Sequence, residues 1–355
     1  MIMGDTPLKV GLIGYGFAGR TFHAPVISAV PELQLTKVVE RSSEKSKERY
    51  PHVEVVRDVQ SLYADPDIDL VVVTTPSTDH YSFAKDALLA GKHVIVEKPF
   101  TTTSEEADEL AVLAKQQGKV ISVFHNRRWD GDYQTVRQVL GQGWLGRISE
   151  AEFRWDRYRP EVTAGRWRDA GDRLGSGVFY DLGVHLIDQA LCLFGKPKAI
   201  SADIRTQRDG AGADDAFEVT LSYADRLNVR LRSSLLVRQP GPRYSLYGTT
   251  GSFVKYGEDP QEDMLKAGLT PLDAGYGIER EDRHGTLDAN MGGLRFSGQI
   301  QTLPGGYHHY FRNVAEHILG RAELEVKPEE ARDAIRLIEL GLASNKEKRT
   351  VNVEW

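Results

Sequence analysis

Short apolar runs alternate with expected helices along the first third of the chain. Ile68–Val73 is apolar and largely β-branched, which is typical of a parallel strand covered by helices on both faces. Ser104–Gln117 is expected to be a helix, because Ser104 can act as its N-cap and Gly118 as its end. This alternation predicts a doubly wound α/β domain on a parallel sheet over residues 1–125. Its strands are expected at Val10–Ile13, Leu33–Val39, Val53–Val56, Ile68–Val73, His93–Val96 and Val120–Phe124.

Beyond residue 125 the pattern becomes one of strand-like runs with few helices between them. It predicts an α+β domain over residues 126–355, with an open, mainly antiparallel sheet and helices on one face. Its strands are expected at Ile148–Trp155, Ala199–Ile204, Ala216–Tyr223, Leu227–Leu236, Tyr244–Gly248 and Ser252–Tyr256. Helices are expected at Tyr307–Leu319 and Pro328–Asn345, and the second of these is free to pack back on the first domain. Gln261–Leu303 gives little periodic signal.

A glycine-rich turn follows the first expected strand and precedes an amphipathic segment. In Gly14-x-Gly16-x-x-Gly19, the first glycine permits a tight turn and the second lets the backbone approach a pyrophosphate. The third lets the following helix pack on its strand, and the helix N-terminus offers unpaired N–H groups to phosphates. This context predicts a Rossmann dinucleotide site, which also includes Tyr15, Phe17 and Ala18.

The end of the second expected strand, Glu40-Arg41-Ser42, lies where a Rossmann domain contacts the adenosine ribose. An acidic residue here favours a free 2′-hydroxyl and therefore NAD, whereas arginine and serine favour a 2′-phosphate and therefore NADP. Three alternatives stay open. Glu40 binds the ribose, or it points away so that Arg41 and Ser42 bind a phosphate, or these are solvated loop residues.

Further polar residues follow later strands, at the edge where α/β proteins bind ligands. Lys98 follows a buried strand and precedes a proline, which is an unusual place for a surface lysine. We therefore expect Lys98 at the site, together with Glu97. His80 either contacts the cofactor or is a partly exposed residue at a helix start. The other cofactor candidates at these strand ends are Thr74, Thr75, Pro76, Arg127 and Trp129.

Asp181 and His185 are four residues apart in a segment expected to be helical, so they share one face. An imidazole titrates near neutral pH and can move the hydroxyl proton when an alcohol is oxidised. Two other interpretations stay open: a capping aspartate with a packed histidine, and a shared metal ion. Because His308 and His309 are adjacent and would diverge, further ligands are not evident and we expect no metal.

Composition changes this picture little. The 355 residues carry a formal net charge of −6 with both signs interspersed, which gives no support to nucleic-acid or membrane binding. The single cysteine, Cys192, excludes an intrachain disulfide and is expected to pack as a small hydrophobic residue. Without a signal-like N-terminus or an apolar run of bilayer length, the expected location is the cytoplasm.

Taken together, the motifs resemble the glucose–fructose oxidoreductase and inositol dehydrogenase family. The resemblance runs from end to end and rests on the glycine motif, on Glu97-Lys98-Pro99 and on Asp181-x-x-x-His185. Within the family, the chain is most similar to the NADP-dependent scyllo-inositol dehydrogenases, through stretches such as His125–Asp130. It departs from them at Glu40, where they carry small hydroxylated residues before an arginine.

The resemblance implies an oxidoreductase that transfers a hydride between a nicotinamide cofactor, NADP or NAD, and a cyclic polyol such as scyllo-inositol. It implies that Lys98, Asp181 and His185 form the catalytic group. It also implies a homo-dimer or homo-tetramer that associates through the C-terminal sheet. The alternatives are a dehydrogenase of another sugar, an NAD-dependent enzyme that modifies glycosides, and a non-catalytic NADP-binding regulator.

A cyclic polyol presents many hydroxyls, so its pocket needs several hydrogen-bonding groups between apolar or aromatic walls. Beyond the catalytic group, we expect substrate contacts from Tyr158, Arg159, Trp167 and His309. A core or surface position is the alternative for each of them. Arg127 and Arg159 could equally form a salt-bridge network with three aspartates, Asp156, Asp169 and Asp172.

Overall fold

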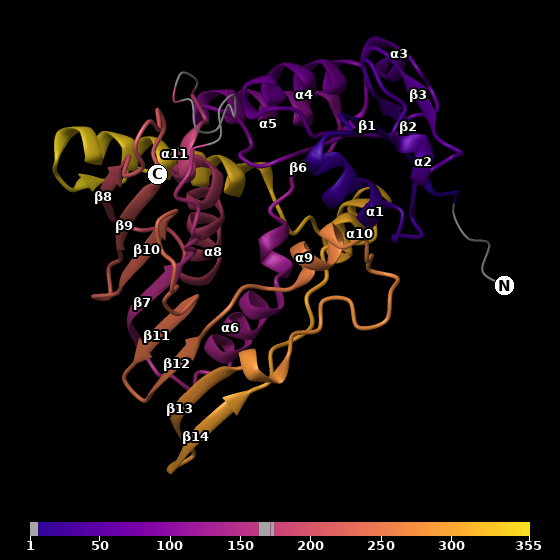
Figure 1. Ribbon diagram of the computed structural model, residues 1–355. Coiled ribbons are helices and arrows are strands. Elements are labelled where there is room, and N and C mark those ends of the chain that lie inside the picture. The colour runs from indigo at the N-terminus through magenta and orange to yellow at the C-terminus, as the bar shows by residue number, and fades with distance from the viewer. Residues whose placement is uncertain (1–5, 163–170, 172–173) are drawn as a thin grey trace. The chain divides into compact units, whose positions relative to one another are not determined.

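The computed structural model describes residues 6–162, 171 and 174–355 (Figure 1). The chain divides into two compact units. The first comprises Met1–Trp129, Pro260–Gly277 and Gly306–Arg332, and the second comprises Asp130–Asp259, Ile278–Gly305 and Asp333–Trp355. Three segments of the expected domain 126–355 therefore belong to the first unit, namely residues 126–129, Pro260–Gly277 and Gly306–Arg332.

The first unit is built on a six-stranded parallel sheet. In spatial order its strands are β3 (Glu54–Val56), β2 (Leu33–Val39), β1 (Leu8–Ile13), β4 (Leu70–Val73), β5 (His93–Val96) and β6 (Ile121–Val123). The direction of winding reverses between β1 and β4, which is where doubly wound sheets bind ligands. All of β4 is buried, as expected for a strand covered on both faces. The predicted Rossmann sheet is confirmed.

Helices cover both sides of this sheet (Figure 1). On one side lie α4 (His80–Leu89) and α5 (Ser104–Gln117), and on the other lie α1 (Ala24–Ile27) and α10 (His308–Ile318). Further helical segments of this unit are η1 (Gly19–His23), α2 (Ser46–Arg49), α3 (Gln60–Tyr63), η2 (Ser77–Asp79), η3 (Asn126–Trp129) and α9 (Gln261–Lys266). The segment η1, which follows the glycine turn, is π-helical.

The N-cap of α5 is Thr103 rather than the expected Ser104. Thr103 has extended backbone angles, and its Oγ1 accepts a hydrogen bond from the N–H of Glu106 at 3.3 Å. Ser104 is the first helical residue. The hydroxyl of Thr103 accepts from the N–H of Glu106, which has no partner within the helix.

The second unit is built on a nine-stranded sheet. In spatial order its strands are β14 (Leu294–Ile300), β13 (Gly285–Met291), β12 (Gly251–Lys255), β11 (Tyr244–Gly248), β7 (Ile148–Arg154), β10 (Asn228–Ser234), β9 (Ala216–Ser222), β8 (Ala199–Arg205) and β15 (Val351–Asn352). Among these strands β7 and β10 pair in parallel, and the other neighbours are antiparallel. The prediction of a mainly antiparallel sheet is confirmed.

The hairpin of β13 and β14 lies in a segment where the sequence shows little periodicity. Gly292 and Gly293 form its turn with φ angles of 61° and 88°, and Met291 pairs with Leu294 across it. The first four residues of β14 are exposed, so no buried face imposes an apolar alternation. A glycine pair between two strands is itself typical of a two-residue hairpin, and it was the signal that could have located this one.

One face of the second sheet is packed and the other is charged. Two helices, α6 (Gly131–Gly141) and α8 (Val184–Phe194), lie on the same side of it (Figure 1). Positions that point to this side, such as Phe153, are buried. Positions on the other side carry cross-strand ion pairs, such as Arg232 with Glu218 at 3.1 Å. Association of subunits through this charged face stays a prediction.

Cys192 is exposed, so the prediction that it packs in the core was wrong. The buried residues of α8 run from Val184 to Ala190. In the last turn Phe194 still packs on Phe153, with ring centroids 6.2 Å apart, whereas Cys192 lies on the exposed face of the helix.

The longest described helix, α11 (Pro328–Glu347), begins in the first unit and continues in the second. Within the first unit its start is held by Arg128, which pairs with Glu330 at 2.8 Å, and by Asp108, which pairs with Arg332 at 3.1 Å. No helix among the described residues combines the length and the apolar character needed to cross a membrane.

A partly buried carboxylate fixes the start of the helical segment formed by η4 (Phe179–Gly183) and α8. Asp214 Oδ2 accepts a hydrogen bond from the N–H of Phe179 at 2.7 Å. Glycine is needed at position 177, where φ is 88°, because a Cβ on Gly177 would lie 1.9 Å from Asp214 Oδ1. Burial raises the pKa of Asp214 to about 6, although the hydrogen bonds to its oxygens favour the ionised form.

The raised pKa of Asp214 predicts a pH-dependent stability. Since this pKa is about 6 in the folded protein and about 4 when unfolded, the folded state binds the proton more tightly. The free energy of unfolding should therefore fall as the pH rises from about 4 to about 6, by at most about 3 kcal/mol. Asp214→Asn keeps a carbonyl for Phe179 and should remove this fall. Urea denaturation across that range measures it, with Asp225→Asn in an exposed turn as the control. An unchanged pH dependence in Asp214→Asn contradicts the prediction.

Candidate active site

The turn after β1 needs glycine at two of its three positions for reasons internal to the protein. Gly14 has a φ of 96°, which disfavours a side chain. A Cβ on Gly19 would lie 2.2 Å from the carbonyl oxygen of Gly14. Apart from its chain neighbours, no described atom lies within 4 Å of a Cβ built on Gly16, which is exposed. Gly16 is therefore open to a ligand, as the second glycine of a pyrophosphate cradle must be.

The other candidates beside this turn are accessible. Phe17 is 56% exposed and packs its ring edge-on against Phe22 at 5.5 Å. Pro76 is exposed, and Tyr15 and Ala18 are partly exposed. Burial raises the pKa of Tyr15. These positions agree with a contact to a bound cofactor, which stays a prediction.

The loop after β4 lies against the glycine turn. The hydroxyl of Thr74 lies 2.9 Å from the carbonyl oxygen of Ile13 and 3.0 Å from that of Gly14, and donates to them. The hydroxyls of Thr75 and Ser77 are buried and make no hydrogen bond within the described parts of the chain. A buried polar group without a partner is unfavourable by about 1–3 kcal/mol. These two hydroxyls fit a loop that completes its hydrogen bonds with a bound group.

His80 is buried, so the predicted partly exposed position was wrong. Its Nδ1 lies 2.8 Å from the carbonyl oxygen of Pro99 and its Nε2 lies 3.0 Å from that of Thr75. Burial lowers the pKa of His80, and the two carbonyls partly oppose this effect. Both ring nitrogens face backbone carbonyls, and the nitrogen that carries the proton donates. His80 therefore lies between the loop after β4 and the loop after β5, and a cofactor contact through its ring nitrogens is not supported.

The carboxylate of Glu40 is turned into its own loop. Its Oε1 accepts from the N–H of Ser46 at 2.9 Å, and its Oε2 accepts from the N–H of Lys45 at 3.0 Å and from the hydroxyl of Ser43. Burial alone would raise the pKa of Glu40, but these hydrogen bonds lower it. Arg41 and Ser42 are exposed. Of the three alternatives, this arrangement favours a Glu40 that points away from the ribose.

Lys98 follows β5, next to the pair formed by His23 and Glu97, whose side chains are 0% and 12% exposed. Glu97 Oε2 accepts from the N–H of Lys98 at 2.9 Å, and Glu97 Oε1 lies 2.8 Å from Nε2 of His23. Burial alone would raise the pKa of Glu97, but the hydrogen bond from His23 and the charge of Lys98 lower it. His23, which lies four residues after the last glycine of the turn, was not among the predicted site residues. No sequence pattern pairs it with Glu97, which is 74 residues away.

Arg127 and Trp129 are buried within the first unit. Arg127 donates to the hydroxyl of Tyr307 at 2.6 Å and pairs with Glu262. The carbonyl oxygen of Trp129 accepts from the side chain of Gln261 at 3.0 Å. These contacts connect the end of β6 with α9 and the start of α10, and the predicted cofactor contacts stay untested.

In the second unit, Asp181 lies in η4 and His185 lies one turn later in α8. The turn that contains Asp181 is π-helical, a form that occurs often at functional sites. His185 is 4% exposed, and its ring packs against that of Trp155 with centroids 5.6 Å apart. Lys98 belongs to the first unit, so each group is held in place by its own unit.

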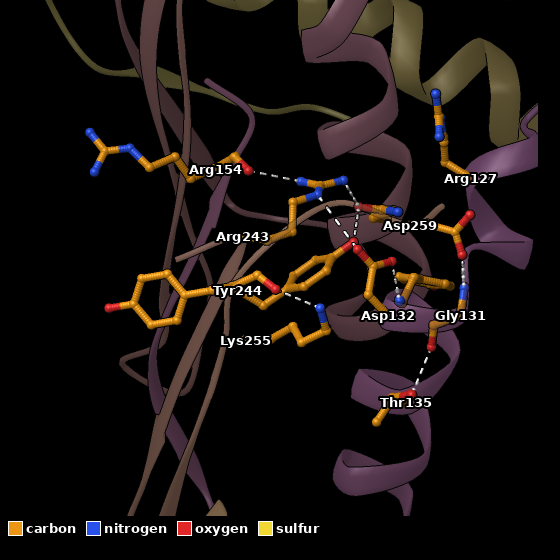
Figure 2. Close-up of polar contacts among 12 residues, drawn as sticks. Arg127, Gly131, Asp132, Thr135, Arg154, Arg243, Tyr244, Lys255 and Asp259 are labelled. Carbon is orange, nitrogen blue, oxygen red and sulfur yellow. Dashed lines mark hydrogen bonds and ion pairs between the residues drawn. The ribbon is translucent and has the colours of Figure 1, made fainter. Parts of the chain in front are cut away.

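A buried polar cluster supports α8 from the sheet (Figure 2). The guanidinium of Arg243 lies 4.7 Å from the ring centroid of Trp155 and donates to Gln189 Oε1 at 3.5 Å. The hydroxyl of Tyr244 donates to the same oxygen at 3.0 Å. Gln189 lies one turn beyond His185, so the cluster fixes both the helix and the indole on which His185 packs. This cluster could not be predicted from the sequence, because its members come from three distant segments.

Two of the predicted substrate residues, Tyr158 and Arg159, lie on an exposed extension of a strand. Tyr158 accepts a hydrogen bond from Arg238 at 2.9 Å. The carbonyl oxygen of Arg159 accepts from the buried Arg208 at 3.3 Å. Trp167 lies outside the described residues. Whether these side chains contact a substrate stays a prediction.

Only one aspartate of the alternative salt-bridge network lies in the described residues. Asp156 pairs at 2.7 Å with Arg154, which is not one of the arginines expected in that network. Asp172 and Asp169 lie outside the described residues. His309 lies in the first unit, where it is exposed and stacks on His308 with centroids 4.1 Å apart. No group of three or more possible metal ligands occurs in the described parts of the chain.

Comparisons with known proteins cover nearly the whole chain. Residues 8–125 match the description "Oxidoreductase family, NAD-binding Rossmann fold", and residues 137–353 match "Oxidoreductase family, C-terminal alpha/beta domain". The scyllo-inositol 2-dehydrogenase (NADP(+)) IolW of Bacillus subtilis (strain 168) is 42% identical, over 98% of this chain and 96% of that protein. The oxidoreductase YdgJ of Escherichia coli (strain K12) is 43% identical, over 97% of this chain and 98% of that protein.

A solved structure shows the same fold. The oxidoreductase YvaA of Bacillus subtilis is 41% identical, with a TM-score of 0.94 over 98% of each chain. Both domain descriptions and both full-length relatives agree with the motifs found in the sequence. The chain therefore belongs to the GFO/IDH/MocA family of oxidoreductases.

Proposed function

We propose that the protein is an NADP-dependent dehydrogenase of a cyclic polyol, with scyllo-inositol and its ketone scyllo-inosose as the favoured pair. The observation that carries the proposal is Lys98 at the carboxyl end of β5, held through Glu97 beside a Rossmann glycine turn. The 42% identity to a scyllo-inositol 2-dehydrogenase over 98% of the chain supports the choice of polyol.

The residues around the turn fit a bound dinucleotide. Gly16 leaves room for a pyrophosphate, and the hydroxyls of Thr75 and Ser77 have no hydrogen-bond partner in the described protein. When bound, the cofactor supplies the nicotinamide carbon that gives or takes the hydride. The protein's part is to hold it and to manage the substrate proton.

The orientation of Glu40 supports NADP as the cofactor. Its oxygens already accept from three donors of the loop and Glu40 is buried, so the carboxylate is turned away from a ribose hydroxyl. Arg41 and Ser42 are exposed next to it and can bind a 2′-phosphate.

Proton transfer falls to residues of both units. His185 is the proposed acid or base for the reacting hydroxyl, because imidazole titrates near neutral pH. Asp181, one turn away, would orient a substrate hydroxyl. The Lys98 ammonium would stabilise the negative charge that develops on the reacting oxygen.

An absorbance assay of nicotinamide reduction tests the proposal. It should compare NAD and NADP with scyllo-inositol, myo-inositol, common aldoses and a glucoside. We expect the highest kcat/KM with NADP and scyllo-inositol. Preference for the glucoside, or release of free sugar from it, would favour the glycoside alternative. If no compound reduces either cofactor while cofactor binding is measurable, the regulator alternative is favoured.

The proton-handling roles predict large losses of turnover on substitution. Lys98→Met and His185→Gln should each lower kcat by about 10²- to 10⁴-fold, the usual contribution of a positioned acid or base. Cofactor affinity, measured by quenching of intrinsic fluorescence, should change little in His185→Gln. Lys115→Met and His284→Gln are the matched controls, because both residues lie outside the site and should leave kcat unchanged. Activity near that of the wild type in both site variants would remove these residues from the mechanism.

The cofactor assignment predicts a selective effect at Arg41. Loss of a charge-assisted contact to a phosphate should raise KM for NADP in Arg41→Ala by about 10- to 100-fold. KM for NAD should change by less than about threefold, because NAD lacks this phosphate. Lys47→Ala, which removes another exposed cation of this region, is the control. An equal loss for both cofactors in Arg41→Ala would contradict the assignment.

A further inference from the structure

We infer that His23 is a positioning residue for Lys98 and acts through the carboxylate of Glu97. The inference rests on the proposed function in one respect, which is that Lys98 takes part in proton transfer. It adds His23, a residue of η1 after the glycine turn, to the residues that position this lysine.

His23 is completely buried in an apolar pocket of the first unit. Its ring centroid lies 4.4 Å from that of Phe124, at the end of β6, and 5.8 Å from that of Phe311 in α10. The ring cannot turn freely between these aromatic neighbours. Its Nε2–H is thus aimed at Glu97 Oε1, 2.8 Å away.

The carboxylate of Glu97, held by His23, in turn holds the backbone of Lys98. Its second oxygen accepts from the backbone N–H of Lys98 at 2.9 Å. The N–H of Glu97 itself belongs to the sheet and donates to the carbonyl oxygen of Val73 at 2.9 Å. The carboxylate therefore extends the fixed part of the strand by one residue, to the backbone of Lys98.

The state of the His23 ring supports a function beyond packing. Its Nδ1 is buried and makes no hydrogen bond within the described residues. This is unfavourable in either protonation state, and an apolar residue of similar size would avoid it. The hydrogen bond to Glu97 is the contact that an apolar residue could not replace.

Amide exchange in the cofactor-free protein tests the inference without any turnover. In His23→Leu, exchange at the Lys98 amide should become about tenfold faster, as expected for the loss of one supporting hydrogen bond. In His23→Gln, whose amide nitrogen can reach the position of Nε2, exchange should stay within about threefold of wild type. The Glu97 amide is the internal control, since its acceptor is the carbonyl oxygen of Val73. If His23→Leu does not fold, His23→Asn replaces it, because its amide is too short to reach Glu97.

Kinetics separate positioning from a general loss of stability. His23→Leu should lower kcat by about 10- to 100-fold with little change in KM for the cofactor, since small displacements of a catalytic group have such effects. In a Lys98→Met background the same substitution should have almost no further effect on kcat, because His23 would act through that lysine. His93→Leu, at a histidine whose ring accepts from the N–H of Val120, is the control.

The outcomes distinguish this inference from the proposed function. Unchanged exchange at Lys98 in His23→Leu, or equal losses of kcat in the wild-type and Lys98→Met backgrounds, would overturn the inference. If the wild type oxidises no polyol but the Lys98 amide responds to His23 as expected, the proposed function fails and the link from His23 to Lys98 stands.

Discussion

The candidate site depends on the in-register parallel pairing of β1, β4 and β5. Ile13 at the end of β1 pairs with Val73, and Val73 pairs with Val96. The next residues of these strands are then held at one edge, where Thr74 donates to Ile13 and Glu97 donates to Val73. A parallel ladder aligns strand ends in this way because its strands run in one direction. The glycine turn and Lys98 therefore follow strands that end at the same edge of the sheet.

Side chains then connect the loops that leave this edge. Thr74 bonds to the carbonyl of Gly14, and His80 bridges the loops after β4 and β5. His23 reaches from the helix after the glycine turn to Glu97. Because each connection joins two groups of the protein itself, the edge keeps its shape without a ligand. Such preorganisation lowers the reorganisation needed when substrate and cofactor bind.

Much of the sheet could be predicted from the sequence, because β4 and β5 are continuous apolar runs and the site residues directly follow them. The spacing of Asp181 and His185 could also be predicted, since one helical turn is a local property. His23 could not, because its partner is set by the fold and lies 74 residues away. Neither could the exposure of Cys192, since the face of α8 that the sheet covers at its last turn is set by the fold.

Glu40 shows why residue type at a motif position is not enough to assign the cofactor. A carboxylate selects the ribose hydroxyls of NAD only when its oxygens are free to accept from them. Here three donors of residues 43–46 occupy both oxygens and keep the group ionised. The same hydrogen bonds order the start of α2 and leave Arg41 on the outside of the loop. A 2′-phosphate at this loop would therefore contact the guanidinium of Arg41, because the carboxylate of Glu40 already accepts hydrogen bonds from its own loop.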